Sequence, residues 1–133
     1  MDTRWLRWGA LCLIAAACAA PRTTAPQWQV EPTEVEAQEV QYVLKQLPRV
    51  VDCVLAGHPE RCGITDNHVE GFSSEQLRSL FGTRHVSMRY AYARRGEPEE
   101  INVVFISSDG RGVVGFEKRH GALIATSVTH IVE

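Results

Sequence analysis

The sequence predicts an α+β domain in which N-terminal helices pack on one face of a three- to four-stranded antiparallel β meander. Two observations lead to this prediction. Apolar residues recur at helical spacing after residue 33, and from residue 86 onward the apolar period changes to two, with turn signals between the runs. Helices followed by hairpin-linked strands are typical of α+β folds.

The chain begins with a segment typical of a bacterial export signal. Arg4 and Arg7 precede an apolar run that ends at Cys18. The run is shorter than the about 20 apolar residues that a transmembrane helix needs. The small residues before Cys18 resemble a bacterial lipoprotein box, although Ala15 stands where that box prefers leucine. This resemblance implies that residues 1–17 are removed and that Cys18 is acylated. The alternative is cleavage after Ala19 or Ala20, which leaves a soluble exported protein.

Residues 18–32 are predicted to be the lipidated cysteine and a flexible tether, and residues 33–133 a single domain. Prolines occur among Thr, Gln and Ala in this stretch, without hydrophobic periodicity. Trp28 is expected to pack on the domain or at the lipid interface, or else to anchor a partner. Ala19 after the cysteine resembles an outer-membrane sorting signal, so we expect a lipid anchor in the outer membrane facing the periplasm.

The first helix is predicted to begin at Thr33, because Thr33 and Glu36 match a capping box. Gly57 is expected to end it. Pro48 predicts either a kink or the start of a second helix. The apolar positions at helical spacing are Val40, Val43, Leu44, Leu47, Val51, Val54 and Leu55.

A second, shorter helix is predicted after a loop at residues 58–72. Ser73 and Gln76 match another capping box, and Gly82 is placed for a left-handed C-terminal cap. Four strands are then expected at residues 86–93, 101–107, 111–119 and 122–132. Residues 96–100, 108–110 and 120–121 are the expected connections between them.

Cys53 and Cys62 are the only cysteines of the predicted domain. In a small exported protein such a pair favours a disulfide, which would stabilise the fold by about 3 kcal/mol. The alternative is a zinc site, because thiolate and imidazole are preferred zinc ligands. Its ligands would be Cys53, His58, Cys62 and His68.

Charge and motifs argue against nucleic-acid binding and catalysis. Removal of Asp2, Arg4 and Arg7 from 14 basic and 16 acidic residues leaves 12 and 15, so the mature chain is slightly acidic. The sequence has neither a nucleophile elbow nor a phosphate-binding loop. We therefore expect a non-enzymatic protein without a cofactor. The candidates for binding an acidic partner are Arg84, Arg89, Arg94 and Arg95, together with Trp28.

Six short motifs resemble, in their order, the small outer-membrane lipoproteins of the SmpA/OmlA family, which are accessory members of the β-barrel assembly machinery. They are SEQL at residues 74–77, LFG at 80–82, YAY at 90–92, VVF at 103–105, DG at 109–110 and VV at 113–114. The resemblance implies a two-helix, three-stranded fold and a role in envelope assembly. The extra strand, the cysteine pair and the long first helix depart from the family's pattern.

We expect a membrane-tethered interaction protein that binds an envelope protein, with exposed sheet edges available for a partner strand. A pilotin-like lipoprotein of a secretion system is a variant of this expectation. The alternative from another class is an exported module that binds a small ligand or a metal, with the loop at residues 58–72 as its site.

Overall fold

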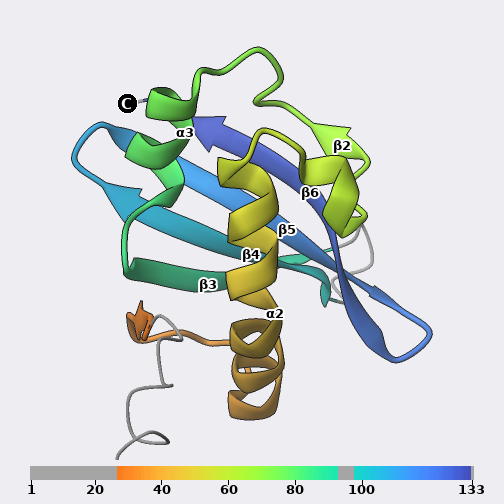
Figure 1. Cartoon of the computed structure of the whole chain (residues 1–133). Coiled ribbons are helices and arrows are strands. Elements are labelled where there is room, and N and C mark those ends of the chain that lie inside the picture. The colour runs from red at the N-terminus through yellow and green to blue at the C-terminus, as the bar shows by residue number, and fades with distance from the viewer. Residues whose placement is uncertain (1–26, 93–97, 133) are drawn as a thin grey trace, which may run out of the picture.

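The computed structural model describes residues 27–92 and 98–132, and it contains one β-sheet and two α-helices (Figure 1). Cys18, Arg94 and Arg95 lie outside these residues. The elements in chain order are β1 Gln29–Val30, α2 Ala37–Leu55, the 3₁₀-helix η2 Pro59–Cys62, β2 Asp66–Asn67, α3 Ser74–Phe81, β3 His85–Tyr92, β4 Pro98–Ser107, β5 Gly110–Arg119 and β6 Ala122–Ile131.

The sheet is six-stranded and mixed, with the order β1-β3-β4-β5-β6-β2. The prediction of N-terminal helices on a three- to four-stranded antiparallel meander is therefore wrong. β1 precedes both helices and pairs in parallel with β3, whereas β2 lies between the helices and pairs in parallel with β6. Both added strands have only two residues, too few to produce an alternating pattern that identifies a strand.

The four long strands lie where the alternation predicts them, and they pair as consecutive antiparallel hairpins. β4 begins at Pro98, inside the stretch expected to be a connection. His120 and Gly121 both have positive φ angles, 51° and 78°, and connect β5 to β6 in a two-residue turn.

α2 is a single helix that contains Pro48, so the predicted second helix beginning at that proline is wrong. The helix begins at Ala37, later than the capping-box prediction. The Thr33 hydroxyl donates to the carbonyl of Met88 in β3 and accepts from the amide of Val35 at 3.1 Å. Thr33 therefore joins the chain to the sheet and does not cap the helix.

α3 has the predicted capping box. The amide of Gln76 donates to Ser73 Oγ at 3.2 Å, and the amide of Ser73 donates to Gln76 Oε1 at 2.8 Å. Gly82 has φ −83° and ψ −3°, so the expected left-handed cap is wrong. Within residues 27–92 and 98–132, no helix combines the length and the apolar character needed to cross a membrane.

Both α-helices cover the same face of the sheet (Figure 1). The ring of Phe81 from α3 occupies the space above Gly112, and it contacts the ring of Phe105 with centroids 5.4 Å apart. Val103 and Val114 are paired across β4 and β5 and are fully buried beneath the helices. Neighbouring positions alternate between faces, so Val104 and Val113 lie on the opposite face, which no described helix covers.

Candidate interaction groove between α2 and the edge of β6

A groove runs between the outer side of α2 and the first half of β6. Two adjoining cavities of about 350 and 420 Å³ form it, and both are lined by Tyr42, Ala122 and Leu123. We call this feature the α2–β6 groove. Its other lining residues are Gln38, Glu39, Lys45, Gln46, Arg49, Val50, Cys62, Lys118, Gly121, Ile124 and Ala125.

The groove has exposed apolar walls. Tyr42 is 46% exposed and Ile124 is 40% exposed, and they are two of the four large hydrophobic side chains exposed among the described residues. Tyr42 projects from α2, whereas Ile124 of β6 stands between two core residues and points to the uncovered face beside the groove. Exposed apolar side chains at the margins of a concave site are typical of a binding surface.

The groove also contains an unpaired strand edge. β2 pairs with β6 only at Ser127 and Val128, and the amide of Thr65 adds one bond to the carbonyl of Thr126. Within the part of the chain that the structure describes, no strand pairs with residues 122–125 on that side. The side-chain amide of Gln46 instead donates to the carbonyl of Leu123 at 3.2 Å.

Positive charge lines the middle of the groove. Lys45 and Arg49 are exposed and one helical turn apart on α2. Neither forms an ion pair with a carboxylate whose side chain the structure describes. These two cations are therefore available to an acidic ligand.

One end of the groove is held by a polar network around Glu39. The ammonium of Lys118 forms an ion pair with Glu39 and lies 3.0 Å from its Oε2, although Oε2 has no hydrogen-bond partner among the described residues. The same ammonium lies 5.1 Å from the centre of the Tyr90 ring. The Tyr90 hydroxyl donates to Glu39 Oε1 at 2.9 Å. Burial is the main cause that raises the pKa of Tyr90, and the neighbouring Glu39 adds to it. The positive charge of Lys118 is thus already balanced.

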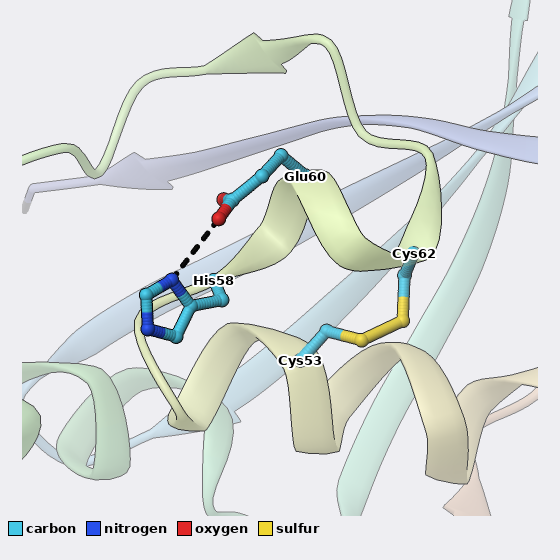
Figure 2. A network of polar contacts seen from close by, with 4 residues as sticks. All are labelled: Cys53, His58, Glu60 and Cys62. Carbon is cyan, nitrogen blue, oxygen red and sulfur yellow. Dashed lines mark hydrogen bonds and ion pairs between the residues drawn. A yellow bond between two sulfur atoms is a disulfide. The ribbon is translucent and has the colours of Figure 1, made fainter.

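The other end of the groove is held by the predicted disulfide. Sγ atoms of Cys53 in α2 and Cys62 in η2 are 1.91 Å apart, with their Cα atoms 6.2 Å apart. Figure 2 shows this bridge beside the ion pair of His58 and Glu60, whose Nδ1 and Oε1 atoms are 3.0 Å apart. A hydrogen bond from its own backbone amide and the contact with His58 lower the pKa of Glu60.

The structure does not bring together the alternative zinc ligands. Both thiols are used in the disulfide, His58 pairs with Glu60, and His68 Nε2 lies 2.7 Å from Asp66 Oδ1. Among the described residues, no group of three or more His, Cys, Asp and Glu side chains is arranged to hold a metal ion.

Of the predicted partner-binding residues, the structure describes Trp28, Arg84 and Arg89, and these three lie away from the groove. Trp28 packs edge-on against Phe105, with ring centroids 5.6 Å apart, and the guanidinium of Arg84 lies 5.2 Å from the centre of the Trp28 ring. Arg89 is exposed on β3 and is paired in register with Asn102. Because the buried Met88 faces the helices, its neighbour Arg89 points to the uncovered face.

Sequence reasoning missed the groove residues. Tyr42 stands on the polar side of α2, between the buried Val40 and Val43, and Ile124 stands between the buried Leu123 and Ala125 of β6. Large apolar side chains at positions that periodicity assigns to solvent are the signal that identifies such a surface.

A second pocket of about 430 Å³ lies between α3 and the end of β6. Ser79 Oγ donates to Asp109 Oδ2 at 2.7 Å, and the ring of His130 contacts that of Phe72, with centroids 4.8 Å apart. Nδ1 of His130 is buried and has no hydrogen-bond partner among the described residues. Ser79 is bonded to the carboxylate and not to the imidazole, so these groups do not form a nucleophile and base pair.

The uncovered face of the sheet carries a group of carboxylates. Glu100 lies over Gly115, where a Cβ atom would collide with the Glu100 carboxylate and the Ser127 hydroxyl. Burial, followed by the negative charges of Glu117 and Asp66, raises the pKa of Glu100. This face is therefore acidic at one end.

Comparison with known protein families, curated proteins and solved structures finds no match to this chain. The residues of the groove, and not a relative, carry the functional argument.

Proposed function

We propose that the protein is a membrane-tethered lipoprotein of the bacterial cell envelope, acylated at Cys18, that acts as a non-enzymatic accessory subunit. In this proposal it binds an envelope protein through the α2–β6 groove. One observation carries the interaction role: the exposed side chain of Tyr42 in α2 lines a groove beside residues 122–125 of β6, an edge that no described strand covers on its outer side.

The proposed location is supported by the sequence before the domain and by the cysteine pair. An apolar run that is too short to span a bilayer ends at Cys18. Cys53 and Cys62 lie at bonding distance, and stable disulfides are typical of oxidising compartments such as the periplasm. More than one acyl chain on Cys18 would anchor the domain stably, since each buried methylene contributes about 0.8 kcal/mol.

The SmpA/OmlA resemblance supports an assembly role in the envelope. The matching motifs extend from Ser74 in α3 to Val114 in β5. They include neither α2 nor β6, which form the groove. The proposed interaction site is therefore argued from this chain alone, and a pilotin-like role uses the same site.

The test of this proposal is membrane fractionation of a bacterial host that produces the full chain, followed by chemical crosslinking and mass spectrometry. We expect the wild-type protein in the outer membrane, crosslinked to a defined envelope protein. Cys18→Ala releases the protein from the membrane in this account. Tyr42→Ala keeps the protein on the membrane but removes the adduct, whereas Arg89→Ala, at an exposed position outside both the groove and the second pocket, keeps both.

Two results would contradict the proposal. If the Cys18→Ala variant stays in the outer membrane, the anchor is wrong. If Tyr42→Ala and Arg89→Ala give the same adducts as the wild type, the groove is not the interaction site.

Binding of a small ligand in the pocket between α3 and β6 is the second candidate function. The observation that favours it is the buried Nδ1 of His130, which has no hydrogen-bond partner among the described residues. Native mass spectrometry of the purified full chain tests it: a bound small molecule that His130→Phe abolishes would support this role, and an unliganded mass for the wild type would contradict it.

A further inference from the structure

We propose that the partner supplies an extended segment with acidic side chains, which adds as a strand to residues 122–125 of β6 inside the α2–β6 groove. This inference rests on the proposed function, since it names the class of partner for the same groove. Three features of the groove carry it: the free strand edge, the apolar walls and the unpaired cations.

The strand edge is open for only a short distance. β2 already occupies the outer side of β6 at Ser127 and Val128, and the chain before β2 reaches the carbonyl of Thr126. Residues 122–125 pair with β5 on one side and have no strand neighbour on the outer side among the described residues. An unpaired edge of this kind presents backbone donors and acceptors to another extended chain.

The bond between Gln46 and Leu123 marks the position that a partner backbone would take. The Gln46 side chain donates to the carbonyl of Leu123 at 3.2 Å, where an adjacent strand would place a backbone amide. A flexible side chain is displaced by a backbone amide without breaking the helix or the sheet. The Gln46 side chain thus satisfies the Leu123 carbonyl in the free protein, and the edge remains available to a partner strand.

The walls of the groove determine the side chains that fit. Ile124 is exposed and points to the uncovered face of the sheet, so alternate residues of an added strand would pack apolar side chains against it there. Lys45 and Arg49 have no ion-pair partner among the described residues, so an adjacent acidic residue would be attracted. Alternating apolar and acidic residues are thus the expected pattern of the segment.

The ends of the groove limit the length of the paired segment. Lys118 and its ion pair with Glu39 lie at the end where β6 begins, and Cys62, held by its disulfide, lies near Ala125. Four strand residues between these ends span about 13 Å at a rise of about 3.3 Å per residue. A short extended segment of a longer partner therefore fits between the two ends.

The test uses the purified full chain and a phage-displayed library of random octapeptides as the probe. We expect enriched peptides that combine aspartate or glutamate with β-branched or aromatic residues at alternating positions. Binding of a synthetic enriched peptide would slow hydrogen exchange of amides in residues 122–125 and leave those at the β3 edge unchanged. Raising the salt concentration from about 0.05 to about 0.5 M would weaken binding, because the attraction between charges is screened.

Two double variants with the same change in net charge test whether the attraction depends on the cations of the groove. Lys45→Glu with Arg49→Glu is expected to weaken peptide binding at least about tenfold, since two attractions become repulsions. Arg78→Glu with Arg89→Glu changes the net charge equally at exposed positions outside the groove, and it is expected to leave affinity within about twofold. N-methylation of one alternate set of peptide amides would abolish binding, whereas methylation of the other set would not.

Four outcomes would overturn the inference. In the first, no peptide is enriched above the level found with an unrelated protein. In the second, the enriched peptides bind the Lys45→Glu, Arg49→Glu variant as tightly as the wild type. In the third, the bound peptide slows hydrogen exchange only outside residues 122–125. Self-association that protects the same amides without peptide would also overturn it, because a second copy would be the occupant. An envelope adduct lost in Tyr42→Ala together with a negative peptide result leaves the proposed function standing and removes only the strand-addition inference.

Discussion

Gln46 and Leu123 are joined by a hydrogen bond of 3.2 Å that links the middle of α2 to the unpaired part of β6. The bond satisfies a backbone carbonyl that no strand reaches from the outer side among the described residues. The same bond therefore contributes to the stability of the domain and occupies part of the groove.

Gln46→Ala is expected to lower the free energy of unfolding by about 0.5–1.5 kcal/mol, the usual net contribution of one hydrogen bond. The measurement is chemical denaturation. Gln41→Ala, an exposed position on the same helix, is the control and should change stability by less than about 0.5 kcal/mol. Equal effects of the two variants would show that the Gln46 bond contributes nothing.

Loss of the disulfide is expected to destabilise the fold by about 3 kcal/mol, because the reduced chain gains loop entropy in the unfolded state. Cys53→Ser with Cys62→Ser tests this by denaturation, and a reducing agent should have the same effect on the wild type only. A wild-type unfolding curve that reducing agent leaves unchanged would contradict the bridge between α2 and η2.

Gly112→Ala is expected to cost about 1–3 kcal/mol of stability, because the added methyl group collides with the Phe81 ring and overpacks the core. The same change in a Phe81→Leu background should cost less, since the smaller side chain leaves room. Thermal unfolding of the four proteins gives the coupling energy. If Gly112→Ala lowers stability by the same amount in both backgrounds, α3 does not pack over Gly112.

Glu100→Gln is expected to raise stability at neutral pH. The pKa of Glu100 is raised in the folded state, so the folded protein binds more protons than the unfolded chain and the wild type loses stability as pH rises through that pKa. A glutamine side chain is neutral at every pH, so it does not destabilise the folded state by burying a charge. The advantage should shrink toward zero below the ordinary pKa of 4.5, where Glu100 is protonated in both states. An advantage that does not depend on pH between about 3 and 7 would contradict this explanation.

Local patterns predicted the long elements because their physical causes are local. Alternation located the four long strands, and the reciprocal bonds between Ser73 and Gln76 need only residues three apart. The prediction that Thr33 caps the first helix is wrong for the opposite reason, because its hydroxyl bonds to Met88, a residue 55 positions away. The two-residue strands depend in the same way on distant partners.

The interaction groove depends on tertiary structure, and residue patterns alone did not find it. Tyr42 and Ile124 are both visible as apolar residues at polar positions, but the groove that they border follows from the packing of α2 beside the edge of β6. The position of that edge follows in turn from β2, which covers only Ser127 and Val128. The cysteine pair was predictable because the predicted export signal would place the chain in an oxidising compartment, where a disulfide is favoured.

The most direct test of the proposed interaction is photocrosslinking in living cells from a photoreactive amino acid at position 42. Position 89, exposed on the uncovered face of the sheet, is the matched control. We predict an adduct with one envelope protein from position 42 and none from position 89, and the crosslinked residue should lie in an extended segment that contains acidic residues. Adducts from position 89 alone, or equal adducts from both positions, would contradict binding at the α2–β6 groove.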